Sequence, residues 1–248
     1  MTPVSAKSSD STERKVSFGP PIFLPVALLL AATALIRVFD LDMRIATWAY
    51  GVGEWRLDAH WFVQLLYRFG TWPAIITASV AAAVWIGSTL HERLQPNLHL
   101  AMFVALSMAI GPGLLVNGLF KEFYGRPRPR EVIEFGGQRE FAPVWEPHIG
   151  EGGKSFPSGH ASMGFFWLTF AVFYHERNRR LALAFAAAAL LHGGSMGFGR
   201  VVQGGHWFSD VIWAVGMDYL AAWFLYRALR LSPAYSVSVP DDRDSTGQ

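Results

Sequence analysis

Six long apolar segments constrain this chain more than any other feature of its sequence. They lie at about 21–39, 72–90, 99–120, 160–175, 181–199 and 207–228. Each is close to the roughly 20 residues that an α-helix needs to cross a bilayer, and the fourth is the shortest. Charged residues make up only 16% of the chain, against about 25% in ordinary soluble domains. The sequence therefore predicts an all-α protein, a transmembrane bundle of six helices.

Polar segments at both ends set the expected domain boundaries. Residues 1–18 are rich in Ser and Thr and carry no apolar pattern, which predicts a disordered N-terminal tail. Residues 19–230 would form the membrane domain, and 231–248 a C-terminal tail. The first apolar segment is expected to stay in the protein as a helix, because no small-residue cleavage site of a signal peptide follows it.

The connections between the segments differ on the two sides of the expected membrane. Short polar turns at 91–98 and 175–180 predict tight hairpins on the side of the tails. The other side carries 40–71, 121–159 and 200–206, and residues 56–69 mix apolar and charged positions as an interfacial helix would. The 21 Lys and Arg residues divide almost equally between the sides. The positive-inside rule therefore places both termini inside the cell only when the candidate site's cations are set aside.

Cations gather directly after the third segment, in the run Lys-Glu-Phe-Tyr-Gly-Arg-Pro-Arg-Pro-Arg that begins at Lys121. Its prolines favour an extended chain that would hold the guanidinium groups in a fixed array. Guanidinium forks match the oxygens of a phosphate two at a time. The alternative is ordinary snorkelling of boundary cations to the membrane surface. We expect Lys121 and Arg128 to bind a phosphate.

The tetrapeptide Pro-Ser-Gly-His opens the fourth segment. Pro157 and Ser158 are typical of a helix start, and the free N–H groups of a helix start bind anions. Ser158 and Gly159 would thus cradle a phosphate with backbone donors, and His160 would lie beside it. A plain capping sequence with an uninvolved histidine is the alternative.

A third cluster leads into the sixth segment. His206 and Asp210 are four residues apart, so they would share one helix face, and Asp210 would fix the tautomer of an attacking imidazole. Gly204 and Gly205 would let the chain fold so that Arg200 and His206 face one point. The alternatives are a helix cap with a boundary arginine, or a metal site, for which a convincing third ligand is missing.

Together and in this order, the three clusters resemble the signature of the type 2 phosphatidic acid phosphatase family. The family pattern is Lys-x6-Arg-Pro, then Pro-Ser-Gly-His, then Ser-Arg-x5-His-x3-Asp. Every position is matched here except the Ser before the arginine, which is Gly199 and puts only a minor phosphate contact in doubt. The resemblance covers roughly 100–228. The hydropathy favours the family's membrane branch over its soluble haloperoxidases.

The resemblance implies a lipid phosphate phosphatase that works without a metal or other cofactor. His206 would be the nucleophile and would form a phosphohistidine, Asp210 would orient it, and His160 would act as general acid and then general base. The expected substrate-binding residues are Lys121, Arg128, Ser158, Gly159 and Arg200.

Bacterial relatives in the family imply three candidate substrates: lipid A, phosphatidylglycerophosphate and undecaprenyl pyrophosphate. A long loop at 131–154 could accommodate a bulky headgroup, which favours lipid A. The expected location is the bacterial inner membrane, with the active site facing the periplasm and both termini in the cytoplasm. Two alternatives stay open: a lipid-to-lipid phosphotransferase, and a lipid-binding protein without catalysis. Net charge of +2 gives no indication of a nucleic-acid partner, and the oligomeric state is not indicated.

Some polar residues lie outside the motif. His192 and Asp218 fall within the fifth and sixth segments, where ionisable groups are costly, and we expect them to pair with each other. Gly111-Pro112-Gly113 predicts a kink in the third segment. Three further arginines are expected to contact anionic lipid, or alternatively a second phosphate or headgroup: Arg126, Arg130 and Arg139.

Overall fold

The protein is a helical bundle throughout the part of the chain that the structure describes. This computed structural model describes residues 19–233, and its regular secondary structure is helical. Two isolated bridges, Gly125 with Gly153 and Val132 with Arg139, are the only β-type pairings in that range. The predicted all-α class is confirmed. The tails predicted at 1–18 and over most of 231–248 lie outside the described residues.

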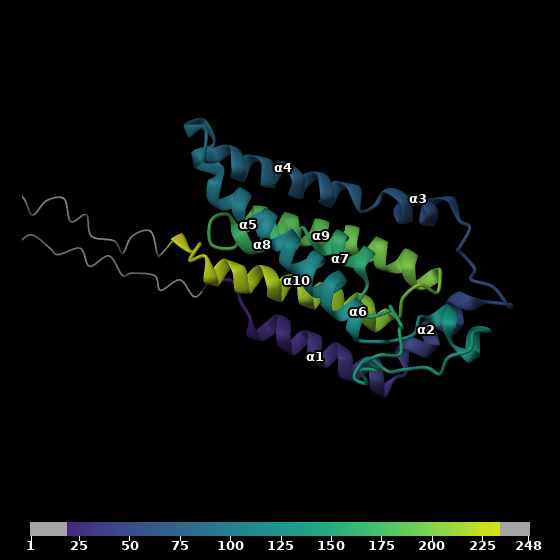
Figure 1. Ribbon diagram of the computed structural model, residues 1–248. Coiled ribbons are helices and arrows are strands. Elements are labelled where there is room, and N and C mark those ends of the chain that lie inside the picture. The colour runs from purple at the N-terminus through teal and green to yellow at the C-terminus, as the bar shows by residue number, and fades with distance from the viewer. Residues whose placement is uncertain (1–18, 234–248) are drawn as a thin grey trace, which may run out of the picture.

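The helices run along a common direction, with the irregular segments gathered at one end (Figure 1). The first half of the chain forms α1 (Phe23–Val38), α2 (Leu41–Tyr50), α3 (Trp61–Phe69), α4 (Trp72–Ser88), η1 (Glu92–Asn97), α5 (Leu98–Met108), η2 (Ala109–Phe120) and α6 (Lys121–Phe123). The second half forms η3 (Pro129–Glu131), η4 (Ile133–Phe135), α7 (Gly159–Phe165), α8 (Leu168–Tyr174), α9 (Arg179–Val202) and α10 (Phe208–Ala228).

Four helical stretches are long and apolar enough to cross a membrane. They are Trp61–Ser88, Glu92–Phe123, Arg179–Val202 and Phe208–Ala228. Helices α1 and α2 make a fifth only if they are counted as one broken span, because they are bent by 66°. The described residues therefore hold four or five candidate spans, and the predicted count of six is not confirmed.

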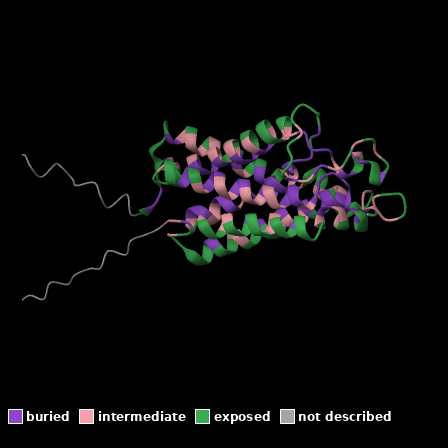
Figure 2. Ribbon diagram, turned by 90° about the horizontal axis from the view of Figure 1, so that it is seen from below, coloured by how far each residue is buried: buried purple, intermediate pink, exposed green. Residues whose placement is uncertain are grey.

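The fourth apolar segment is the one that differs most from a simple span. It forms two short helices, α7 and α8, separated at Phe166 and Trp167. Both pack against α9 and α10, and buried residues run through the middle of the bundle while exposed residues lie on the outer helices (Figure 2). Gly164 and Gly193 allow the close approach of α7 to α9, since a Cβ on Gly164 would lie 2.5 Å from the Cα of Gly193. The segment is short because it is the core of the bundle, surrounded by protein.

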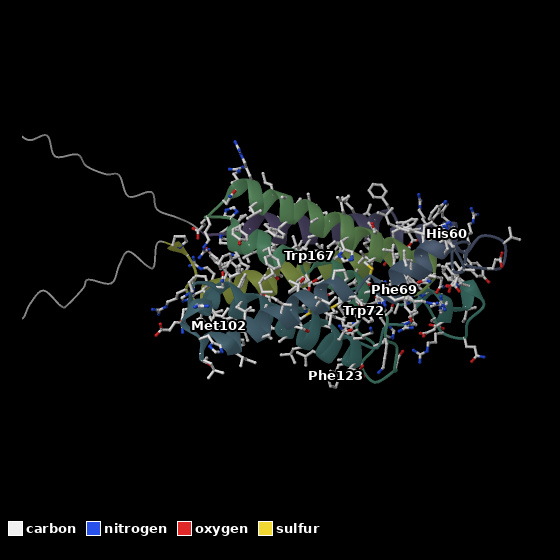
Figure 3. All side chains as sticks on the ribbon, turned by 90° about the horizontal axis from the view of Figure 1, so that it is seen from above. His60, Phe69, Trp72, Met102, Phe123 and Trp167 are labelled. Atoms are coloured by element: carbon white, nitrogen blue, oxygen red, sulfur yellow. The ribbon has the colours of Figure 1, made fainter. Side chains whose placement is uncertain are left out.

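The amphipathic segment predicted at 56–69 is helical from Trp61 and runs on into α4. Together α3 and α4 form a stretch of 28 residues, and Figure 3 labels Phe69 and Trp72 at their junction. Gly70 brings this junction against α9, because a Cβ there would lie 2.1 Å from the sulfur of Met196. This contact places α3 beside the irregular end of the bundle.

The Gly111-Pro112-Gly113 step lies in a π-helical stretch, η2, that continues α5. Proline has no N–H to donate and its ring crowds the preceding turn, and a wider helical turn accommodates it. The carbonyl oxygen of Pro112 accepts a hydrogen bond of 2.7 Å from the side chain of Asn117. One turn further on, Lys121 begins α6.

The close contact of α7 with α9 gives a stability prediction. Gly164→Ala should lower the melting temperature in detergent, because overpacking of this kind costs about 1–3 kcal/mol. Gly194→Ala is the matched control, since a Cβ there meets nothing within 4 Å and alanine is the better helix former. Equal melting temperatures for the two variants, measured by intrinsic tryptophan fluorescence, would contradict the close packing.

Candidate active site

The three sequence clusters meet at the end of the bundle that carries the long connections. Lys121 follows η2, His160 lies in the first turn of α7, and His206 lies between α9 and α10. The charges of Lys121 and Arg200 act on both histidines, and that of Arg128 acts on Lys121. The structure thus brings the predicted site residues together from three separate parts of the chain.

Lys121 is held in place by the π-helical stretch below it. Its Nζ donates a hydrogen bond of 3.3 Å to Oδ1 of Asn117, whose amide nitrogen is committed to Pro112. The ammonium group keeps two further donors for a ligand. The widened helix therefore orients one cation toward the site.

Arg128 and Arg200 carry donors that lack an acceptor. Within residues 19–233, the Nε atoms of both side chains are buried and have no hydrogen-bond partner. Nη1 of Arg200 is fixed by Oε1 of Gln203 at 2.6 Å, and Gly205 makes room for the guanidinium, since a Cβ there would lie 2.2 Å from Nη2. Buried donors are normally satisfied, so two unsatisfied guanidinium donors in one place indicate an anion-binding site.

The N-terminus of α7 has the expected cap but fewer free donors than predicted. Ser158 is the N-cap, and its Oγ accepts from the N–H of Ala161 at 3.4 Å. Its own N–H donates to the carbonyl of Asp210 at 3.2 Å. The prediction that this N–H binds a phosphate is therefore wrong, because the start of α10 already uses it.

Gly159 keeps the role that the helix start predicts. Its N–H and that of His160 have no hydrogen-bond partner among the described residues. A Cβ at Gly159 would lie 2.5 Å from Oδ1 of Asn117 and 3.2 Å from Nζ of Lys121. Only glycine lets the start of α7 approach the lysine so closely, which brings backbone donors and an ammonium group to one point.

His206 is buried and its tautomer is fixed. Its Nδ1 lies 2.6 Å from the carbonyl oxygen of Ser155 and 3.5 Å from Oδ2 of Asp210. The nearer acceptor is thus the carbonyl of Ser155. This corrects the sequence prediction that the carboxylate of Asp210 is the partner of the imidazole. Oδ2 of Asp210 already accepts from the N–H of Trp207 and from Oγ of Ser155. A carbonyl can only accept, so Nδ1 carries the proton and Nε2 keeps its lone pair.

Burial lowers the pKa of His206 to about 4, and the charges of Arg200 and Lys121 act in the same direction, while Asp210 opposes them. The imidazole is therefore neutral near pH 7. A neutral imidazole with a free Nε2 is the form that attacks an electrophile.

Tyr67 contacts two of the site residues from α3. Its ring stacks on His160 with a centroid distance of 4.9 Å and an interplanar angle of 16°. The guanidinium carbon of Arg200 lies 4.7 Å from the centre of the same ring. The backbone of Tyr67 also hydrogen-bonds to His160. One side chain thus fixes the relative positions of a histidine and a cation.

Arg126 is not the lipid-facing residue that the sequence predicts. Its side chain is completely buried and forms ion pairs with Asp42 at 2.8 Å and Asp210 at 2.5 Å. Burial alone would lower the pKa of the guanidinium, but the two carboxylates outweigh it and hold the pKa above its ordinary value. Arg126 therefore acts inside the protein, behind the site.

The other two extra arginines make local contacts. Arg130 bonds to the carbonyl of Gln203 and lies 3.6 Å from a carboxylate oxygen of Asp58. Arg139 donates to the carbonyl of Glu151 at 3.0 Å. Both side chains tie connecting segments together at the irregular end of the bundle.

His192 and Asp218 do not pair with each other. His192 accepts from the indole N–H of Trp167 at 2.9 Å, and Oδ1 of Asp218 accepts from Oγ of Ser162 at 2.9 Å. The prediction of a direct pair is wrong because the fourth apolar segment supplies the partners of both residues, Ser162 from α7 and Trp167 from the break between α7 and α8.

Among residues 19–233, no group of three or more His, Asp and Glu side chains is placed to hold a metal ion. The candidate site is built from cations, backbone donors and two histidines. Sequence reasoning missed three of its supporting residues. The roles of Tyr67, Ser155 and Asn117 depend on tertiary contacts, and only Asn117, one helical turn before Lys121, could have been found from spacing.

Comparison with known proteins supports the same family. Residues 100–233 match the PAP2 superfamily. The chain is 34% identical to a lipid A 4'-phosphatase of Francisella tularensis subsp. novicida over 86% of this chain and 98% of that protein. It is 32% identical to a lipid A 4'-phosphatase of Rhizobium leguminosarum over 58% of each chain. No solved structure gives a significant match.

The contact of Tyr67 with Arg200 predicts a difference between two substitutions. Tyr67→Leu should weaken the binding of inorganic phosphate by about three- to thirtyfold, because a cation–π contact contributes about 0.5–2 kcal/mol. Tyr67→Phe keeps the ring and should bind like the unaltered protein. Titration calorimetry in detergent measures both, and a loss in the Phe variant equal to that in the Leu variant would show that the hydroxyl, rather than the ring, matters.

Proposed function

Because the chain belongs to the PAP2 superfamily, we propose that it is a membrane lipid phosphatase that removes the 4'-phosphate of lipid A through a phosphohistidine on His206. Lipid phosphatase activity is the part that the family match and the curated relatives support directly. The choice of lipid A rests on the names of those relatives.

One structural observation carries the mechanism. A neutral His206 with a free Nε2 lies among cations, two of which have buried donors without an acceptor. A phosphate monoester supplies the missing acceptors and places its phosphorus next to a nucleophile. Preorganised donors of this kind also stabilise the charge that develops on the equatorial oxygens in the transition state.

The reaction would proceed in two steps. In the first, the lone pair of His206 Nε2 attacks phosphorus, and the bond from phosphorus to the lipid oxygen breaks. Burial and the nearby cations lower the pKa of His160 to about 4 in the empty site, and the negative charge of the bound phosphate would raise it. The protonated His160 would then give its proton to that leaving oxygen. In the second, His160 takes a proton from water, the water oxygen attacks phosphorus, and the N–P bond breaks to return the electron pair to Nε2. Inorganic phosphate leaves and His160 has regained its proton.

The remaining residues would bind and orient. Lys121, Arg128, Arg200 and the N–H of Gly159 would hold the phosphate oxygens. Ser158 would act as a helix cap, and Asp210 would fix the turn that carries the nucleophile. The network behind His206 would also stabilise the positive charge that forms on the imidazole during the attack.

The first prediction of this proposal concerns the nucleophile. Purified protein should release phosphate from lipid A in the presence of EDTA. The rate of release should be lower with phosphatidylglycerophosphate, undecaprenyl pyrophosphate or phosphatidic acid. His206→Ala and His160→Ala should each lower turnover by about 10⁴-fold or more, as the loss of a nucleophile or its proton-transfer partner does elsewhere. His91→Ala, an exposed histidine at the opposite end, is the control.

The outcomes separate the alternatives. Full activity of His206→Ala would refute the phosphohistidine. Transfer of label to a second lipid when that lipid is added, without release of free phosphate, would identify a phosphotransferase. Absence of release and of transfer from every lipid would favour the non-catalytic binding protein. Labelled phosphate bound to the protein, stable to alkali and lost in acid, would support the intermediate.

We also propose that the protein lies in the bacterial inner membrane with its active site facing the periplasm. The chain has no cysteine, so single cysteines report sidedness cleanly. Glu134→Cys, on the exposed part of the long connection, should react with a membrane-impermeant thiol reagent in spheroplasts. Glu92→Cys, exposed at the opposite end, should react only after lysis. The reverse pattern would invert the orientation.

A further inference from the structure

Each of the three guanidinium nitrogens of Arg126 donates to an acceptor inside the protein. Its Nε donates to the carbonyl of Ala142 at 2.8 Å. Nη1 donates to Oγ of Ser209 at 2.7 Å and to Oδ1 of Asp210 at 2.5 Å. Nη2 donates to Oδ2 of Asp42 at 2.8 Å. The side chain has no exposed surface. A guanidinium held in this way cannot also bind a substrate phosphate.

Asp42 reaches this position from the N-terminal part of the chain, outside the matched residues 100–233. Its two carboxylate oxygens accept from the N–H and the Oγ of Ser209 at 2.8 and 2.6 Å. The 66° bend between α1 and α2 turns the start of α2 toward the start of α10. Asp40 makes the bend with a left-handed backbone (φ 50), which Asp tolerates better than most residues.

We propose that Arg126 and Asp42 are positioning residues that act on the nucleophile His206 through Asp210. This inference rests on the proposed function, because it gives the two residues a part in that reaction. Neither contacts the phosphate. Their part is to keep the carboxylate of Asp210 ionised and in place within a region closed to water.

The path from Arg126 to His206 is short and continuous. Arg126 holds Oδ1 of Asp210, and Oδ2 of Asp210 accepts from Oγ of Ser155 at 2.5 Å. The carbonyl of Ser155 holds Nδ1 of His206 at 2.6 Å, and the N–H of Ser155 donates to the carbonyl of Arg126 at 3.0 Å. The arginine thus fixes both groups that face Nδ1 of the nucleophile.

The charges explain why an arginine is needed. Asp42 and Asp210 are both buried and both bind Arg126. Two carboxylates without a cation would repel each other in a poorly solvated site, and one of them would take up a proton. A protonated Asp210 would lose its hold on Trp207 and Ser155, and the imidazole would lose its fixed tautomer and its nearby negative charge.

A charge-compensation cycle tests this role. The variants are Arg126→Met, Asp42→Asn and the double variant, with Arg139→Met as the control arginine from the same connection. For Arg126→Met we expect kcat to fall about 100-fold with KM within about threefold, since the phosphate-binding cations are untouched. This is smaller than the loss of about 10⁴-fold when the orienting carboxylate of a serine protease is replaced.

The double variant distinguishes a positioning role in the reaction from a purely structural role of Arg126. Asp42→Asn removes one of the two negative charges, so it should restore kcat at least fivefold in the Arg126→Met background. Non-additivity of this kind is the mark of directly coupled residues. Additive losses, or a rise in KM with kcat unchanged, would overturn the proposal. Arg139→Met should behave like the unaltered enzyme.

Two further measurements keep the result interpretable. Arg126→Lys keeps the charge without the fork, so it tests the proposal even if Arg126→Met is not recovered folded. This charge-preserving variant should lose kcat less than tenfold, and Asp42→Asn should not restore activity in its background. A larger loss, or a rescue, would overturn the proposal. Inactivity of the unaltered protein on all lipids would refute the proposed function instead, and the melting temperatures of the cycle would still report the coupling of Arg126 with Asp42.

Discussion

The charge of Asp210 has to be balanced inside a bundle that water does not reach, and much of the site follows from this constraint. An isolated carboxylate in such surroundings would be too costly to keep ionised. Here the guanidinium of Arg126, the hydroxyl of Ser155 and the N–H of Trp207 surround it. Arg126 and Ser155 lie near the two ends of the connection between α6 and α7, and Trp207 directly precedes α10. Satisfying one charge therefore also fixes how this connection meets the start of α10.

The site lies at the end of the bundle for a related reason. Cations are expensive within the hydrocarbon region but not at its boundary, and helix starts offer free N–H groups only where a helix begins. Lys121, Gly159 and Arg200 all lie where a helix begins or ends. A lipid phosphate at the membrane surface would lie at the same depth, so the proposed substrate would meet the site without leaving the membrane.

The sequence predicted which residues gather at the site better than it predicted the residues that support them. The spacing of His206 and Asp210, and the Pro-Ser-Gly-His start of α7, are local patterns, and a local pattern carries its own geometry. The partner of Nδ1 could not be found in this way, because a backbone carbonyl such as that of Ser155 has no sequence signature. The role of Asp42 was also invisible, since its partners Ser209 and Arg126 lie 167 and 84 positions away.

The prediction of the fold also succeeded for local features and failed for those that depend on tertiary packing. Hydropathy found the helical regions, because each long apolar run is helical, but it could not count the spans. An apolar segment is apolar either because lipid surrounds it or because protein does, and α7 with α8 belongs to the second class: most of its residues are buried against α9 and α10.

That central position has a functional consequence. A close-packed protein core has low compressibility. A helix start that is packed on all sides is therefore a more rigid support than one that faces lipid. Gly159 and His160 begin this central helix. The donors and the proton-transfer group of the proposed reaction are therefore carried by a helix that other helices enclose, while Tyr67 approaches them from α3 on the outside of the bundle.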